Sequence, residues 1–285
     1  MEQRKINGER MEQTENGSKA ELMNTASLEA VSFTTAPSPS QTLGTEIQQY
    51  VERAIEGLLA SLPDIDQLSA DQRRGIIARY TAVLEGNFIY WMTGAYLAVT
   101  SEQARLIILG NLHEEVRDSH PRMLRTFAIA AQAIPGDSDA IAIHRDLTNV
   151  RLFVGRLSGV RILIMMAFFE GFIQRFMPYL AELAALQGSP ECEYTDVHGI
   201  CDVTHTKELF DALSSEMALN PPEPAEDFYE GIGLLRALIQ GIVDSNLADD
   251  RWKPIGLAAC AHAGKQNGAL SDPGMILNNR VSVGD

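Results

Sequence analysis

The stretch RILIMMAFFEGFIQRFMPYL, residues 161–180, belongs to the longest apolar segment of the chain, which runs from Ile162 to Leu186. Charged and polar side chains interrupt this segment at Glu170, Gln174, Arg175 and Glu182. A charge near the centre of a membrane helix costs roughly 2.5–3.5 kcal/mol on insertion. The pattern therefore predicts a helix buried in a soluble protein, and not one that spans a membrane.

The overall composition is that of a folded globular protein. Apolar residues make up 45% of the 285 residues and charged residues 21%, which excludes a wholly disordered chain, a collagen-like repeat and a disulfide miniprotein. The net charge of −15 repels phosphate backbones and anionic lipids, so neither nucleic acid nor a membrane surface is an expected partner. Three cysteines without a CxxC pair, together with the lack of an apolar signal sequence at the N-terminus, predict a reduced, cytoplasmic protein.

The two ends of the chain differ from its middle. Residues 1–42 and 265–285 are polar and show no sustained apolar period, which is typical of solvated tails. One helical domain is expected between them, over residues 43–264.

Apolar side chains three and four residues apart predict helices throughout this domain. The expected ranges are 45–62, 70–98, 101–120, 122–133, two or three helices within 139–187, then 195–219 and 225–247. Ser69 with Gln72, and Thr100 with Gln103, are capping-box pairs at two of the helix starts. Pro121 disfavours helical geometry at His120 and predicts a kink there. Runs of β-branched residues bounded by turns are absent, so the fold class is all-α, in a single bundle.

The segment HGICDVTH, residues 198–205, carries the first candidate metal ligands. On a helix, His198, Asp202 and His205 lie within about 60° of one another, since their spacings are four and three residues. Imidazole and carboxylate together favour iron or manganese over magnesium. Because the outer two are about 10 Å apart along a helix axis, two neighbouring ions fit this spacing better than one. The alternative is a polar stripe on a surface helix.

Two carboxylates in apolar helices are further candidates. Glu170 lies among apolar residues on all sides, and Glu85 lies similarly within YTAVLEGNFIYWMTGAYL. A buried lone carboxylate must be protonated, paired or bound to a metal. The alternative for both is a salt bridge, for instance from Glu170 to Arg161 or Arg175, or a helix face that reaches water.

The segment NLHEEVRDSHP, residues 111–121, concentrates several possible ligands at the end of a helix. Glu115 and His120 are five residues apart and would face different directions on a regular helix, so only a kink or a π-type bulge would bring them together. The residues themselves leave open whether Glu114 or Glu115 is the ligand, or whether both form a solvated acidic patch.

Taken together, the HxxxDxxH helix, the preceding buried glutamates and the upstream NLxEE segment ending in histidine resemble the heme-oxygenase-like diiron oxidases. The resemblance covers about residues 80–219. It implies a single heme-oxygenase-like bundle of about seven core helices, binding two non-heme Fe(II) ions in place of heme. Its implied ligands are Glu85, Glu115, His120, Glu170, His198, Asp202 and His205, with Glu115 preferred over Glu114 because it lies four residues after Asn111. His198 and Asp202 are implied to complete the second iron site.

The resemblance further implies an oxidoreductase with O2 as co-substrate. The leading expectation is oxidation of a small amino acid or amine, by N-oxygenation in natural-product biosynthesis. Oxidative C–C cleavage, such as decarboxylation of a fatty or amino acid, is the alternative that keeps the metals. A third possibility is a metal-free heme-oxygenase-like scaffold or binding protein.

The expected partners follow from these enzyme hypotheses. They are a small-molecule substrate, an external electron donor where the reaction requires one, and a second copy of the chain in a homodimer. Arg151, Arg161 or Arg175 could clamp a substrate carboxylate, although each is as readily explained by a structural ion pair.

Overall fold

The computed structural model describes residues 39–222 and 227–244. Its α-helices are α1 Pro39–Leu59, α2 Ala70–Ala98, α3 Glu102–Arg117, α4 His120–Ala130, α5 Asp137–Val154, α6 Gly159–Leu186, α7 Glu193–Leu219 and α8 Glu230–Val243, with a 3-10 turn at Ile65–Gln67. No strand occurs within these ranges. The all-α prediction is confirmed, with eight α-helices where about seven core helices were expected.

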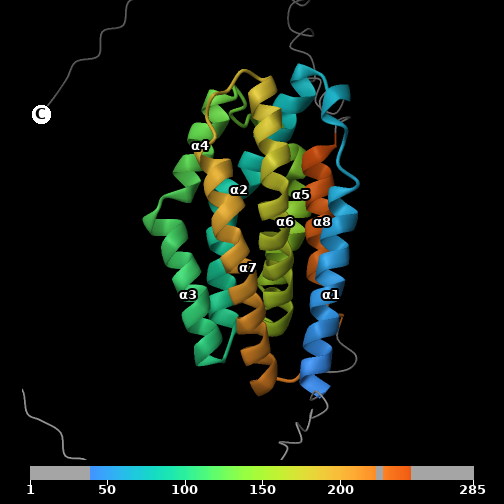
Figure 1. Cartoon of the computed structure of the whole chain (residues 1–285), viewed down its shortest axis with the longest axis vertical. Coiled ribbons are helices and arrows are strands. Elements are labelled where there is room, and N and C mark those ends of the chain that lie inside the picture. The colour runs from blue at the N-terminus through green and yellow to red at the C-terminus, as the bar shows by residue number, and fades with distance from the viewer. Residues whose placement is uncertain (1–38, 223–226, 245–285) are drawn as a thin grey trace, which may run out of the picture. The chain divides into compact units, whose positions relative to one another are not determined.

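Helix α6 is the core of the bundle and packs against α7, α2, α1 and α8 (Figure 1). Its side chains are buried almost all the way round from Val160 to Phe172. Phe172 stacks on Phe176 with ring centroids 5.1 Å apart, and burying each such side chain contributes roughly 1.5–3 kcal/mol. Within the described residues, no helix combines the length and the hydrophobicity needed to cross a membrane.

The helix starts show where local sequence decides the structure and where it does not. The capping box of Ser69 and Gln72 at the start of α2 is confirmed. The predicted second box at Thr100 is wrong, because the N-cap of α3 is Ser101. The backbone N–H and hydroxyl of Thr100 donate instead to the carboxylate of Glu216 on α7.

A break between α3 and α4 is present close to the predicted position, but it lies before His120, which is the first residue of α4. Ser119 has a φ of 59° in the left-handed region, which reverses the helical direction over one residue. Pro121 follows in the first turn of α4, where its missing N–H costs no helical hydrogen bond.

The predicted tails are only partly covered by the structure. Helix α1 begins at Pro39, inside the predicted tail of residues 1–42. The remainder of that tail and the predicted tail at 265–285 lie outside the described residues. The domain boundaries therefore stay predictions.

Candidate metal centre

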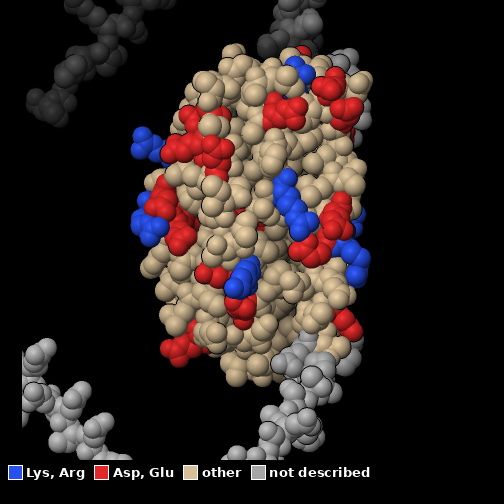
Figure 2. Space-filling model, in the orientation of Figure 1, with Lys and Arg blue, Asp and Glu red and all other residues tan. Residues whose placement is uncertain are grey.

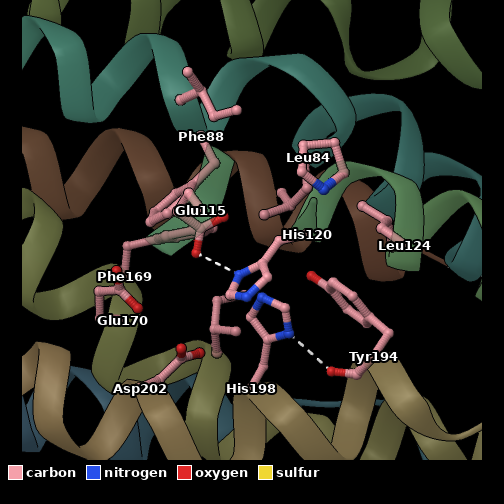
Figure 3. Close-up of a pocket in the computed structure, with 13 residues that line it drawn as sticks. Leu84, Phe88, Glu115, His120, Leu124, Phe169, Glu170, Tyr194, His198 and Asp202 are labelled. Carbon is pink, nitrogen blue, oxygen red and sulfur yellow. Dashed lines mark hydrogen bonds and ion pairs between the residues drawn. The ribbon is translucent and has the colours of Figure 1, made fainter. Parts of the chain in front are cut away.

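One pocket in the bundle is lined by side chains from α2, α3, α4, α6 and α7 (Figure 3). Its apolar wall consists of Leu84, Phe88, Ile89, Pro121, Leu124, Phe169 and Ile173. The other wall carries the polar side chains, which are Glu115, His120, Glu170, Tyr194, His198 and Asp202. The pocket therefore sets several possible metal ligands against a hydrophobic surface.

The break at Ser119 brings Glu115 and His120 together across the ends of α3 and α4. His120 Nδ1 donates to Glu115 Oε1 over 2.7 Å, and both side chains are buried. Burial by itself lowers the pKa of His120, but the hydrogen bond and charge of Glu115 outweigh it, so that the pKa lies above its usual value.

His198 on α7 completes this group from the opposite side. Its ring lies 4.6 Å from the ring of His120, centroid to centroid, in an edge-to-face arrangement. His198 Nδ1 donates to the backbone carbonyl of Tyr194 over 2.8 Å, which leaves the lone pair of Nε2 available to a metal. Burial lowers the pKa of His198 to about 4, so the ring is a neutral ligand at pH 7.

Two acids on neighbouring helices face this group without sufficient partners. Glu170 Oε1 on α6 and Asp202 Oδ2 on α7 are buried and accept no hydrogen bond. Burial raises the pKa of Asp202 to about 7. Burial also raises the pKa of Glu170 well above its usual range, and the charges of Asp202 and Glu115 add to that effect. Acids gathered in one pocket with free oxygens form a natural cation site.

His205 lies one turn beyond Asp202 on α7. Its Nε2 donates to Oε2 of Glu114 over 3.0 Å, while its Nδ1 lies 3.7 Å from Asp202 Oδ1 and has no hydrogen-bond partner. The His205 ring is 3% exposed, whereas the Glu114 side chain is 46% exposed. Glu114 therefore orients His205 from the surface, and Glu115 belongs to the pocket.

These side chains form two groups of potential ligands. Glu115, His120 and His198 make up the first, and Cys201, Asp202 and His205 the second; within each group the ligand atoms lie within 4.8 Å of one another. The two groups adjoin at Asp202, which also lines the pocket. Imidazoles and carboxylates suit iron, and the unpartnered atoms on Glu170, Asp202 and His205 are free to bind a cation. The residues present fit iron.

The structure brings together all the predicted ligands except Glu85. Glu85 pairs with Arg125 over 2.5 Å on the outside of the bundle, and its side chain is 35% exposed. Its neighbour Leu84 lines the pocket instead. The grouping also differs from the implied one, because His198 joins Glu115 and His120 and not Asp202.

Sequence reasoning missed Tyr194 and Cys201. Tyr194 lies four residues before His198, and Cys201 lies four residues before His205, so helical spacing places each on the face of a ligand. Tyr194 also donates to or accepts from Tyr80 through their buried hydroxyls, 2.8 Å apart. This hydrogen bond holds the Tyr194 ring, which packs against the His198 ring at a centroid distance of 4.2 Å.

The three arginines considered for a substrate carboxylate are engaged elsewhere. Arg151 donates to Asn87, Arg161 pairs with Glu230, and Arg175 pairs with Glu52. The structural ion pair is confirmed for Arg161 and Arg175, whereas the partner of Arg151 is a neutral amide. Among the described residues, neither arginine nor lysine lines the pocket.

Comparison with protein families matches residues 78–238, more than half of the chain, to a family described as iron-containing redox enzymes. The matched range contains every predicted ligand. No curated protein and no solved structure matches the chain significantly. With its helical bundle and its cluster of histidines and acids, the chain belongs to the heme-oxygenase-like family of iron-containing redox enzymes.

Proposed function

We propose that this iron-containing redox enzyme is a non-heme diiron oxygenase that uses O2 to oxidise a small amine or amino acid, with N-oxygenation as the reaction. The observation that carries the proposal is the pair of adjoining ligand groups, one around His198 and one around His205, beside an apolar pocket. Two groups rather than one favour two ions.

Each group would hold one ion with the chain's own side chains. Glu115, His120 and His198 would hold the first ion, and Asp202 with His205 would hold the second. Glu170 is close enough to both Glu115 and Asp202 for their charges to raise its pKa. Its carboxylate would therefore be available as a ligand to either of the two metal positions. When bound, two ferrous ions supply the capacity to reduce O2.

The walls of the pocket favour an amine over a carboxylate. Glu115, Glu170 and Asp202 offer negative charge or hydrogen-bond acceptors to an amino group, and the described lining residues include no arginine or lysine to bind a carboxylate. The apolar wall around Phe88 and Phe169 fits a hydrocarbon portion of the same molecule. N-oxygenation of an amine by O2 inserts one oxygen atom, reduces the other to water and consumes two electrons and two protons. The two electrons must come from an external donor.

Oxidative C–C cleavage of a fatty or amino acid is the second candidate. It is favoured by the apolar wall, because Phe88, Leu124, Phe169 and Ile173 offer an aliphatic chain a hydrophobic surface. It is disfavoured because the described lining residues include no arginine or lysine.

Anaerobic Fe(II) loading followed by O2 and candidate substrates tests the proposal. We expect close to two equivalents of iron per chain and a product that has gained oxygen on nitrogen, measured by mass spectrometry. Loss of CO2 would support the second candidate instead. The His198→Ala variant should lose iron and turnover, whereas the matched surface variant His113→Ala, at an exposed position of α3, should keep both.

Iron uptake well below one equivalent by a properly folded sample would contradict both candidates. The chain would then be better described as a metal-free scaffold on the same fold.

A further inference from the structure

We propose that the second metal position has a thiolate ligand, Cys201, beside Asp202 and His205. This inference rests on the proposed function insofar as the neighbouring group also binds a metal. It goes beyond that function, because it assigns a sulfur ligand and a preference for softer ions to one of the two positions.

The spacing on α7 places the three side chains together. Cys201 and His205 are four residues apart and share a face of the helix, and Asp202 lies between them in sequence. One ligand atom of each lies within 4.8 Å of the others. Around a tetrahedral ion with bonds of about 2.0–2.3 Å, neighbouring ligand atoms are about 3.5 Å apart, so small side-chain movements would close the site.

The hydrogen bond from His205 to Glu114 determines which ring nitrogen can bind a metal. Because Nε2 carries the proton that is donated to Glu114 Oε2 over 3.0 Å, Nδ1 presents a lone pair. That lone pair lies 3.7 Å from Asp202 Oδ1 and has no donor. Two buried electron-rich atoms facing each other are unfavourable unless a cation lies between them.

The carboxylate of Asp202 also has an unpartnered oxygen. Asp202 Oδ2 has no hydrogen-bond partner although the residue is only 1% exposed. Oδ1 of the same carboxylate accepts the S–H of Cys201 at 3.1 Å. The thiol hydrogen therefore occupies part of the space that a cation would fill, and an ion entering the group would replace it.

Binding of a divalent ion by this group is a proton exchange without oxidation. The Cys201 S–H bond breaks, a sulfur–metal bond forms, and the proton leaves to water. Cys201 is half-buried and not sealed in the core, so the proton has a route out. The thiolate and the carboxylate together balance the charge of a divalent ion.

The sulfur ligand would make the two positions chemically different. The group of Glu115, His120 and His198 offers only oxygen and nitrogen, whereas the group at Cys201 adds a soft thiolate. Thiolates select ions such as zinc, cobalt and ferrous iron over magnesium and calcium. The second position is therefore expected to keep such ions in the presence of excess magnesium.

Titration of the metal-free full chain with Co(II) tests the inference directly. A cobalt–thiolate bond gives a charge-transfer band in the near ultraviolet, while cobalt bound by nitrogen and oxygen gives only the weaker visible bands. We expect the near-ultraviolet band in the wild type, its loss in Cys201→Ser, and retention in that variant of the visible bands from the first position.

The matched control is the double variant Cys192→Ser/Cys260→Ser, in which Cys201 is the one remaining cysteine. It should keep the full charge-transfer band. Circular dichroism of each variant establishes that the helices are intact, and Cys201→Ala provides a second variant should serine disturb the helix.

Two outcomes would overturn the inference, and they are distinguishable. Cobalt bound without a near-ultraviolet band, or a band that disappears in the double variant and survives in Cys201→Ser, would remove the thiolate and leave the proposed function standing. No cobalt bound by any folded variant would overturn the thiolate and the proposed metal centre together.

Discussion

Helix α7 carries buried acids of two opposite kinds. Near its C-terminal end, Glu216 is 2% exposed and its carboxylate is fully used. It accepts from the backbone N–H groups of Thr100 and Ser101 at 2.9 and 2.8 Å, from the Thr100 hydroxyl, and from the Asn220 amide. About 21 Å along the helix axis, Asp202 has a buried oxygen with no partner at all.

The difference separates an acid whose oxygens are satisfied within the fold from an acid that keeps an unsatisfied oxygen. Both acids are equally hidden from water, and burial alone does not distinguish them. Glu216 acts as a cap supplied from another helix, because its negative charge and acceptors lie at the N-terminal end of α3. Asp202, with Glu170 across the pocket, carries the cost of burial without that compensation, and a cation would supply it.

Among the single substitutions, removal of the fully hydrogen-bonded acid Glu216 should have the largest effect on stability. Glu216→Ala leaves the buried N–H of Ser101 and the partly buried N–H and hydroxyl of Thr100 without this acceptor, so we expect the free energy of unfolding to fall by about 3 kcal/mol. Urea unfolding measured by circular dichroism gives this value. The pocket lies far from Glu216, so iron binding per folded molecule should be unchanged; a loss of iron with unchanged stability would contradict the distinction.

The two acids with unpartnered oxygens, Glu170 and Asp202, should make the metal-free protein less stable as the pH rises. Unfolded Asp loses its proton near pH 4, while folded Asp202 has a pKa of about 7. Between these values the folded state holds the extra proton, so stability falls with increasing pH, by up to about 1.4 kcal/mol per unit for each such group. Glu170 contributes in the same direction, because its pKa is also raised.

His198 works in the opposite direction, since its pKa of about 4 makes stability rise with pH up to about 6.5. The raised pKa of His120 gives stability that is present below about pH 6.5 and is lost at higher pH. Comparison with Glu170→Gln/Asp202→Asn isolates the acids. The wild type should lose stability relative to this variant from pH 4 to 7; parallel curves would show that the acids have ordinary pKa values.

A change from glutamate to glutamine should raise the stability at Glu170 and lower it at Glu216. Glu170→Gln removes a buried acid that lacks partners, and the new amide can donate to Asp202, so the metal-free protein should gain about 1 kcal/mol at pH 8. Glu216→Gln should instead lose stability, because the amide N–H groups face the donors of Thr100 and Ser101. Thermal unfolding of both variants, with iron removed, measures the contrast, and equal signs would refute it.

The smallest effect is expected at Glu85. Its ion pair with Arg125 is exposed, and such pairs contribute roughly 0–1 kcal/mol. Glu85→Gln should therefore change stability by no more than about 0.5 kcal/mol and should leave iron uptake intact. A loss of one equivalent of iron in this variant would restore Glu85 as a ligand.

Capping motifs in the sequence predicted helix starts well where no distant residue bonded the same backbone groups. Helix α2 begins and ends as predicted, because the capping box at Ser69 is satisfied within its own turn. The cap predicted at Thr100 was wrong, since its donors go to Glu216, a residue more than a hundred positions away. Sequence spacing carries no information on such a partner.

The same limit applies to the metal centre. The helical spacing of His198, Asp202 and His205 and the apolar surroundings of Glu170 identified side chains that the structure gathers at the candidate site, since both patterns are local. The position of Glu85 outside the pocket lining has a physical cause. Helix α2 is buried on several sides, so its apolar pattern does not define which face meets the pocket. A shift of one residue, about 100° of rotation, separates Glu85 from Leu84.

The break at Ser119 also has a consequence for the order in which the centre assembles. The contact between Glu115 and His120 closes a loop of a few residues and costs little chain entropy, so this pair can form as soon as α3 and α4 do. His198 arrives only when α7 docks from far along the chain. Iron captured early by the local pair would favour that docking, so metal supply would act during folding as well as on the finished enzyme.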